Sequence, residues 1–260
     1  MTAITHGRVL RIAGPIVLSN ATVPLLGAVD TAVIGQLGDA ASLGAVGLGA
    51  VILATLYWAF GFLRMSTSGL AAQAQGAGDM GERSAVLLRA LIVSLGAGLA
   101  LVLLQSLLFA AAFRVAPASD QVEGLAHSYL AIRIWGAPAT IALYALTGWL
   151  VGLERTRGVL VLQLWQNGLN ILLDLWFVLG LGWGVPGVAL ATLIAEWTGL
   201  LLAMWLARDA FGAVLREALA RLGDRIAVRR MFSASRDIMG RTILLQPSFT
   251  TFVFLGARFG

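Results

Sequence analysis

The sequence predicts an all-α polytopic membrane protein. Of its 260 residues, 59% are hydrophobic and only 12% are charged, and the mean hydropathy is +0.88. Soluble domains usually carry about 25% charged residues. Several apolar runs approach the roughly 20 residues that a helix needs to cross the hydrocarbon core, and none shows the alternating pattern of a transmembrane strand. The spans are therefore expected to be helical.

Hydropathy divides the chain into six spans with polar connections. They cover Ile12–Ile34, Leu43–Leu63, Ala85–Phe113, Tyr129–Val151, Val159–Leu181 and Pro186–Leu206, and a seventh begins near Ile238. The first run is too long for the core of a cleaved signal peptide and lacks a small-residue exit, so we interpret it as a retained span. The corresponding domains are a six-helix N-terminal lobe at 1–207, an inter-lobe loop at 208–237 and the truncated start of a C-terminal lobe at 238–260.

The end of the chain resembles its beginning. The hexapeptide that starts at Arg236 opens the seventh span much as the hexapeptide that starts at His6 opens the first, and a Gly-Ala pair follows within each span. A repeat in the same orientation is an arrangement that some transporters use. We therefore expect a second six-helix half, with this sequence as a fragment that lacks its C-terminal lobe.

The arginines predict the orientation of the spans. All 18 basic residues are arginine, and if the six spans alternate, only Arg114 lies in a loop on one side. The other side holds Arg8, Arg11, Arg83, Arg89, Arg155, Arg157 and the stretch from Arg208 to Arg241. The positive-inside rule then places the N-terminus and the 208–237 loop in the cytoplasm, in a plasma membrane that would be the inner membrane of a bacterium.

The same placement explains the basic charge balance without nucleic acid as a partner, because the arginines flank spans in the lipid bilayer. Two readings of the 208–237 loop stay open. Its mixture of arginines and leucines is typical of an amphipathic helix at the membrane surface. We favour a solvated loop whose arginines only fix the topology.

Several function classes lack the residues they need. There is no cysteine, so a disulfide framework, a thiolate metal site and a cysteine nucleophile are excluded. Neither histidine accompanies a carboxylate at metal-ligand spacing, and there is no nucleophile elbow or phosphate-binding glycine loop. We expect no metal, no cofactor beyond a coupling ion, and no enzyme activity.

One polar stripe interrupts the fifth span. Gln163, Asn167, Asn170 and Asp174 follow one another at i, i+4, i+7 and i+11, which places them on one side of a helix. A stripe that ends in a carboxylate is costly in lipid unless it faces water or polar partners. The stripe is therefore predicted to form one wall of a transport cavity.

Three motifs carry a family resemblance. The run from Gly27 to Gly38 (GAVDTAVIGQLG), the run from Phe60 to Ala74 (FGFLRMSTSGLAAQA) and the Asn170–Asp174 pair resemble the multidrug and toxic compound extrusion (MATE) transporters, in particular their DinF-like branch. The resemblance implies twelve helices in two six-helix lobes, which export organic, often cationic, compounds in exchange for H⁺ or Na⁺. It also implies that Asp30, Asn170 and Asp174 form the cation-coupling site of the N-terminal lobe. The family has a further polar residue of this site on the fourth helix, and the motifs do not place that residue in this sequence.

Depth along the spans supports that assignment independently. Asp30 lies four residues before the outer end of the first span and Asp174 seven before that of the fifth, which puts them roughly 6 and 10 Å deep. Two neighbouring carboxylates in a low-dielectric site resist simultaneous ionisation, so a proton or monovalent cation could be held between them. Gln163 and Asn167 then line the cavity that leads to this site. The alternatives are that Asp30 caps a neighbouring helix and that the asparagines only join helices.

Two further charges lie deep within spans. Glu196 is near the middle of the sixth span and Arg133 lies inside the fourth, at depths that differ by only about 6 Å. A buried Arg133–Glu196 ion pair is favoured over a second proton site.

Two prolines, Pro15 and Pro24, lie in the span that carries Asp30. Each removes a backbone donor and favours a kink. The resemblance implies a first helix that bends as Asp30 gains or loses a proton. A static kink is the competing interpretation, since kinks are common in membrane helices.

The leading function is an antiporter for multidrug efflux by alternating access, with a small organic substrate and H⁺ or Na⁺ as the coupling ion. The alternative is a lipid or lipid-linked-sugar flippase of the same superfold, which is expected to line its cavity with arginines for phosphates. The amide and carboxylate stripe favours cationic or neutral cargo instead. A membrane-embedded enzyme is the least favoured class.

Overall fold

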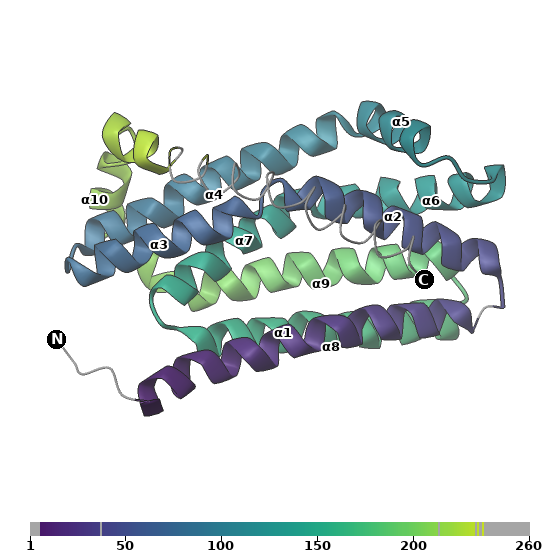
Figure 1. Ribbon diagram of the computed structural model, residues 1–260, viewed down its shortest axis with the longest axis horizontal. Helices are drawn as coiled ribbons and strands as arrows, with labels where there is room; N and C mark the ends of the chain where they lie inside the picture. The colour runs from purple at the N-terminus through teal and green to yellow at the C-terminus, as the bar shows by residue number, and fades with distance from the viewer. Residues whose placement is uncertain (1–5, 37, 213, 232, 234–235, 237–260) are drawn as a thin grey trace, which may run out of the picture.

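The computed structural model describes residues 6–36, 38–212, 214–231, 233 and 236. In those ranges every regular element is helical, so the all-α architecture expected from the sequence is confirmed (Figure 1). The predicted seventh span, with the rest of 238–260, lies outside the described residues. The elements are α1 (His6–Gly35), α2 (Ala40–Trp58), α3 (Phe62–Gly76), α4 (Met80–Leu103), α5 (Gln105–Val115), α6 (Asp120–Arg133), η1 (Ile134–Gly136), α7 (Ala137–Gly152), α8 (Thr156–Asp174), η2 (Leu175–Gly180), α9 (Gly184–Leu206), η3 (Arg208–Phe211) and α10 (Leu215–Ala220).

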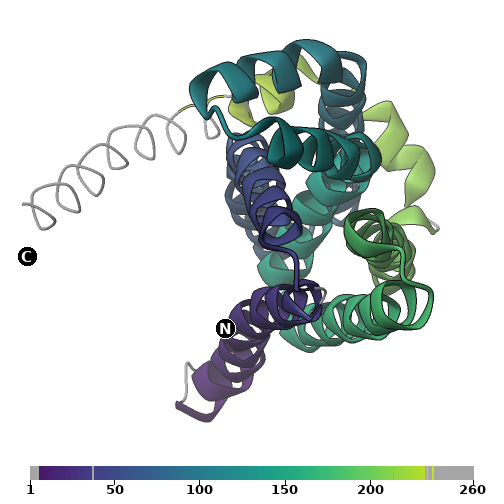
Figure 2. The same cartoon turned by 90° about the vertical axis from the view of Figure 1, so that its right-hand side faces the viewer.

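The long helices run side by side along the longest dimension of the molecule (Figure 1). α8 packs between α1 and α9, while α7 packs against both α3 and α4, and α2 packs against α6. Viewed along the bundle, α1 and α8 form one edge of it (Figure 2). The two helices that carry the predicted carboxylates are therefore direct neighbours.

Four helical segments in the described part of the chain are long and apolar enough to cross a membrane. They are Ala40–Gly76, Met80–Leu103, Asp120–Gly152 and Gly184–Leu206, which correspond to the second, third, fourth and sixth predicted spans. α1 and α8 correspond to the first and fifth predicted spans and also run along most of the bundle (Figure 1). The polar stripe of α8 lowers its hydropathy, as expected for a helix that turns one side toward polar partners.

The third predicted span, Ala85–Phe113, is wrong as a single helix. α4 ends at Leu103, and Leu104 leaves helical geometry with φ −91° and ψ 4° before α5 begins. Nothing in the local sequence explains this break. The fourth span also changes geometry, because the three-residue 3₁₀ turn η1 separates α6 from α7.

Glycine allows α3 and α7 to approach closely. A Cβ added at Gly148 would lie 2.3 Å from the carbonyl oxygen of Arg64, and one at Gly152 would lie 2.5 Å from that of Ser68. No larger residue fits such contacts with backbone, which are typical of membrane helix interfaces. This packing holds α3 next to α7, within a hydrophobic cluster that includes Leu87, Leu146 and Trp149.

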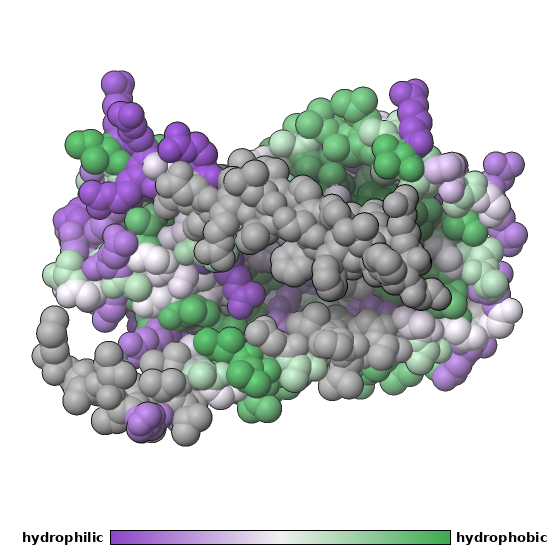
Figure 3. Space-filling view, viewed as in Figure 1, coloured by the Kyte–Doolittle hydropathy of each residue, from purple (hydrophilic) through white to green (hydrophobic). Residues whose placement is uncertain are grey.

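The surface divides by polarity along the bundle. Hydrophilic residues gather toward its two ends, and hydrophobic residues cover much of the side between them (Figure 3). Exposed apolar side chains such as Val17, Leu99, Leu172 and Leu201 lie on the long helices. A membrane protein turns such a surface toward lipid, where exposed leucine and valine carry no penalty.

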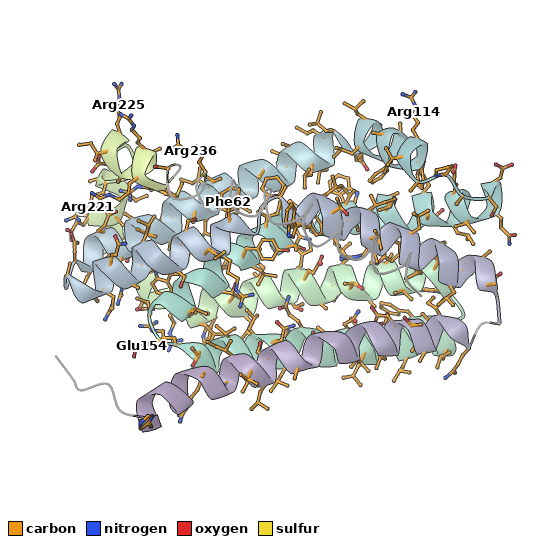
Figure 4. All side chains as sticks on the ribbon, in the orientation of Figure 1. Phe62, Arg114, Glu154, Arg221, Arg225 and Arg236 are labelled. Atoms are coloured by element: carbon orange, nitrogen blue, oxygen red, sulfur yellow. The ribbon has the colours of Figure 1, made fainter. Side chains whose placement is uncertain are left out.

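Four arginines, Arg83, Arg89, Arg155 and Arg221, form ion pairs at one end of the bundle, hereafter the arginine-rich end. Figure 4 shows Arg221 and Arg225 at this end and Arg114 at the opposite end. α10 also lies at the arginine-rich end, where it packs against α4.

The segment after α9 is docked on the bundle. The Asp209 carboxylate accepts hydrogen bonds from Arg155 at 2.7 and 2.8 Å and from Arg83 at 2.9 Å. Farther along, Arg221 donates to Asp79 at 2.7 Å, and the Arg221 carbonyl accepts a hydrogen bond from Arg89. The expected solvated loop, whose arginines only fix the topology, is therefore wrong for 208–212 and 214–224. The sequence could not show that aspartates at distant positions meet these arginines.

These contacts act on the pKa values of both aspartates. Burial opposes ionisation of Asp209, but the hydrogen bond from Arg155 and the charges of Arg155 and Arg83 outweigh it, so the Asp209 pKa lies below its ordinary value. The Asp79 pKa is lowered first by the backbone N–H of Glu82, at the start of α4, and then by Arg221. Both carboxylates are therefore ionised at neutral pH and able to hold the arginines.

Candidate functional site

The carboxyl groups of Asp30 and Asp174 lie together between α1 and α8. Asp30 precedes the end of α1 at Gly35, and Asp174 is the last residue of α8. The two carboxyl groups are close enough to share a hydrogen bond. Asp174 is fully buried, at 0% exposure. Two carboxyl groups within hydrogen-bonding reach of each other favour a shared proton or a bound cation, because two ionised groups repel each other strongly in a low-dielectric site.

The amide of Asn170 bridges this pair to α9. One end of the amide lies 3.2 Å from Asp30 Oδ1 and 3.3 Å from Asp174 Oδ2, and the other end lies 3.2 Å from Thr192 Oγ1. Asn170 is 1% exposed. The site thus joins three helices, because the Asn170 amide contacts two carboxyl groups at one end and one hydroxyl group at the other.

The direction of the Asn170 amide depends on what the carboxyl groups hold. Ionised carboxylates only accept hydrogen bonds, so they require the Nδ2 end of the amide. With Nδ2 toward the aspartates, Asn170 Oδ1 accepts from the hydroxyl and backbone N–H of Thr192. A protonated carboxyl or a bound cation instead attracts Oδ1, which turns Nδ2 toward Thr192 Oγ1 at 3.2 Å. Thr192 serves both orientations, because its hydroxyl can donate or accept.

The other two members of the stripe lie farther along α8. Gln163 Nε2 donates to Asn167 Oδ1 at 3.1 Å. Asn167 is buried, whereas Gln163 is only partly buried. The stripe therefore has a hydrogen-bonded section at Gln163 and Asn167 and a separate section at Asn170 and Asp174 that meets Asp30.

A local change of helix type follows Asp174 directly. η2, at Leu175–Gly180, is a π-helical segment, in which the backbone winds more widely than in an α-helix. Phe177 stacks on Trp183 at a centroid distance of 5.0 Å, which ties this segment to the start of α9. Short π segments are frequent at functional sites, and the sequence carries no signal for this one.

Pro15 and Pro24 lie within one continuous helix, because α1 runs without a break from His6 to Gly35. Each proline leaves one carbonyl of α1 without its intrahelical donor. Asp30 is therefore carried by the C-terminal part of a helix with two missing backbone bonds before it.

Arg133 and Glu196 form a bidentate ion pair between α6 and α9. Arg133 Nη1 donates to Glu196 Oε2 at 2.6 Å and Nη2 donates to Oε1 at 2.9 Å. The two side chains are 8% and 12% exposed. Glu196 lies one turn of α9 after Thr192, whose hydroxyl contacts Asn170 of the aspartate site, so the ion pair and the aspartate pair belong to one charged cluster.

Thr192 is a site residue that the sequence reasoning missed. It lies four residues before Glu196 in α9, so both belong to one side of that helix. A polar pair at this spacing is the signal that could have identified it. No group of three or more His, Asp or Glu side chains that could hold a metal ion occurs in the described part of the chain.

Comparisons with known proteins give a family and a set of relatives. The MatE family model matches residues 15–176. The chain is 41% identical to the DNA damage-inducible protein F of Escherichia coli K12 over 255 residues, which cover 96% of this chain and 54% of that protein. It is 32% identical to a probable multidrug resistance protein NorM of Deinococcus radiodurans, covering 96% of this chain and 55% of that protein. The chain thus spans about half the length of these curated relatives.

The fold has a matching solved structure. A crystal structure of MATE in the straight conformation superposes with a TM-score of 0.75 and 26% sequence identity, covering 92% of this chain and 54% of that one. The bundle described above therefore corresponds to about half of a longer transporter structure.

Proposed function

The chain belongs to the MatE family, and we propose that it forms the N-terminal lobe of an antiporter that exports organic, often cationic, compounds in exchange for H⁺ or Na⁺. The family match covers more than half of the chain, and relatives at 41% and 32% identity include a probable multidrug resistance protein. Proteins of this family are multi-pass membrane transporters rather than enzymes. The coupling ion, the cargo and the second lobe belong to the proposal.

The contact of Asp30 and Asp174 through Asn170 carries this proposal. These residues belong to α1 and α8, while the Thr192 hydroxyl belongs to α9. A proton or monovalent cation between the carboxylates removes their repulsion and holds α1 against α8 and α9. Its release leaves two buried negative charges, which favour an arrangement that separates or hydrates them.

Alternating access follows from this difference between the loaded and unloaded site. A ligand shifts a conformational equilibrium only by its differential affinity for the two states. The coupling ion stabilises the arrangement in which α1, α8 and α9 meet at the site, and substrate stabilises the other arrangement. Exchange of one for the other then couples the export of substrate to the movement of the ion down its gradient.

The polar surfaces available to cargo favour cationic or neutral compounds. The stripe of α8 presents amides and a carboxylate, and the buried Arg133 is neutralised by Glu196 of α9, the helix that packs against α8. Phosphate-bearing cargo would require arginines free to bind it. We therefore propose small organic cations as the preferred substrate class.

The arginine-rich end is proposed to face the cytoplasm, with the N-terminus on the same side. Arg83, Arg89, Arg155 and Arg221 all lie at this end, and Arg114 lies at the other. Such an asymmetry marks the cytoplasmic side of a membrane protein. The relationship to the Escherichia coli protein supports a bacterial inner membrane as the location.

The test uses the full-length transporter, with both lobes, reconstituted into vesicles loaded with a fluorescent organic cation such as ethidium. An imposed proton gradient and an imposed sodium gradient are applied separately. Efflux that accelerates under one of the two gradients, and not under a potassium gradient of the same size, is the expected result. Efflux that responds to neither gradient would reject cation-coupled export.

A further inference from the structure

The aspartate pair and the ion pair beside it bring three carboxyl groups and one guanidinium group into the interior. The Glu196 carboxylate accepts hydrogen bonds from both Nη groups of Arg133. Glu196 lies one turn of α9 after Thr192, which contacts Asn170 of the aspartate site. A buried ion pair is worth little for stability when apolar residues could replace it. Its position beside a pair of acidic groups therefore calls for a different explanation.

The backbone is shaped to hold this ion pair in place. A Cβ added at Gly136 would lie 2.1 Å from Glu196 Oε2 and 3.3 Å from Arg133 Nη1. Gly136 ends η1, the 3₁₀ turn that follows Arg133. The turn and the missing side chain together allow the Glu196 carboxylate to enter between α6 and α7. Arg133 is thus fixed at a defined position in the cluster.

Two groups in this cluster have unused hydrogen-bonding capacity. Within the described residues, Arg133 Nε is a buried donor and Asp174 Oδ1 a buried acceptor, and neither has a hydrogen-bond partner. Buried polar groups are nearly always hydrogen-bonded, so each of these two atoms requires an explanation, and a role in the site is one. Here one is a cationic donor and the other an anionic acceptor, so the two are chemically complementary.

Tyrosines lie near the ion pair. All three tyrosines of the chain, Tyr57, Tyr129 and Tyr144, are close enough to Glu196 for its charge to act on their hydroxyl groups. Tyr57 is 5% exposed, and its hydroxyl has no hydrogen-bond partner among the described residues. A hydroxyl that can donate or accept stabilises Glu196 if the guanidinium moves away from it. The surroundings of Glu196 thus permit a change of partner for Arg133.

We propose that Arg133 is a positioning residue shared between Glu196 and the Asp30–Asp174 pair. When the pair holds its coupling ion, Arg133 remains bidentate on Glu196. When the ion leaves, the two ionised aspartates draw the guanidinium toward Asp174, which weakens the contact between α6 and α9. Arg133 thereby competes with the coupling ion and relates the occupancy of the site to the packing of the lobe.

This inference rests on the proposed function, because it assumes that the aspartate pair binds the coupling ion. It makes predictions of opposite sign for two variants of the full-length transporter in vesicles. In Glu196→Gln, Arg133 loses its anionic partner and competes more strongly for the aspartates. In Arg133→Gln/Glu196→Gln, the competing charge is absent, and the two amides can still bond to each other.

The measurement is the coupling-ion concentration that gives half-maximal efflux. It should rise about tenfold in Glu196→Gln and fall about tenfold in the double variant, a size typical of coupling between sites. Arg114→Gln, which removes an exposed arginine at the far end of the bundle, should match the parent protein. Thermal unfolding in detergent monitors folding, and the double variant should recover the stability that Arg133→Gln alone loses.

A purely structural ion pair gives a different result. In that case, both variants would have the ion dependence of the parent, which would overturn the inference. Arg133→Lys adds a test with the charge retained: an ammonium lacks the planar fork needed to serve two carboxylates, so its ion dependence should also change, and parental behaviour would contradict the proposal. If Asp174→Asn transports normally, the proposed function itself fails. If Asp174→Asn is inactive while these variants behave as the parent, only the role of Arg133 fails.

Discussion

The Asn170 amide in α8 and the Thr192 hydroxyl in α9 lie 3.2 Å apart. Because the other end of the amide touches Asp30 and Asp174, Thr192 links α9 to both carboxyl groups through one side chain. The hydroxyl also lies 3.0 Å from the Val188 carbonyl, to which it can donate. Thr192 can therefore keep a partner in either orientation of the Asn170 amide.

Replacing Thr192 with Val should weaken the site without disrupting α9, since valine has nearly the same shape. One end of the Asn170 amide then loses its side-chain partner, at a cost of about 1–3 kcal/mol. The affinity for the coupling ion, measured from the ion dependence of efflux, should change by about tenfold or more.

The matched control is Thr55→Val. The Thr55 hydroxyl bonds only to its own helix, at Val51 O, on an exposed face of α2. This variant should retain the parental ion dependence. Equal effects of the two substitutions would show that Thr192 has no specific role.

Gly136→Ala should disrupt the Arg133–Glu196 ion pair. The added methyl group would lie 2.1 Å from Glu196 Oε2, so Glu196 must move away from a buried arginine. Overpacking of this kind typically costs about 1–3 kcal/mol. Thermal unfolding in detergent should show a clear loss of stability.

Gly124→Ala is the control for that change. Gly124 is exposed on α6, and an added Cβ would meet nothing within 4 Å. Alanine should stabilise the helix by up to about 1 kcal/mol. If both variants were destabilised by the same amount, disruption of the ion pair would not explain the loss of stability in Gly136→Ala.

Asp209→Asn should loosen the segment that follows α9. It removes the charge that holds both Arg83 and Arg155, of which Arg83 is 4% exposed. Because Asp209 itself is 37% exposed, solvent screens the interaction, and the expected loss is about 1 kcal/mol. Limited proteolysis should then cut between Gly212 and Arg230 faster than in Asp120→Asn, an exposed substitution at the other end of the bundle. Equal cleavage rates would argue against docking by Asp209.

Acidification should release the same segment. The pKa values of Asp79 and Asp209 are lowered from an ordinary 3.8. A lowered pKa in the folded state contributes stability that is present above the unfolded-state value and lost as the pH falls through the folded-state pKa. The protection of residues 214–224 against hydrogen exchange, relative to the intrinsic exchange rate at each pH, should therefore be constant near neutral pH and should fall below about pH 4. A loss of protection already near pH 6 would point to another titrating group.

Much of the bundle could be predicted because lipid imposes simple rules on sequence. Apolar runs of sufficient length indicated the helices, and the stripe at Asn170 and Asp174 marked the polar side of α8. Depth along the spans put Arg133 near Glu196, and the structure pairs them. These predictions use only periodicity and distance along a helix, which the sequence contains directly.

The remaining features depend on contacts between distant residues. Three features have no signal in the local sequence. They are the π segment after Asp174, the break at Leu104 and the contact of Asp209 with Arg83 and Arg155. Thr192 was missed because threonine is common within membrane helices, where it often bonds to its own backbone. Only the packing of α8 against α9 shows that its hydroxyl faces Asn170.

The most direct test of the central claim is ion-driven efflux by Asp174→Asn in the full-length transporter, reconstituted into vesicles. The substitution keeps the shape of the side chain and removes the charge that the coupling ion must balance. We predict that gradient-driven efflux is lost, while membrane insertion and thermal stability remain close to those of the parent and of Asp120→Asn. Efflux at the parental rate, with the parental dependence on the ion gradient, would contradict the assignment of Asp30, Asn170 and Asp174 as the coupling site.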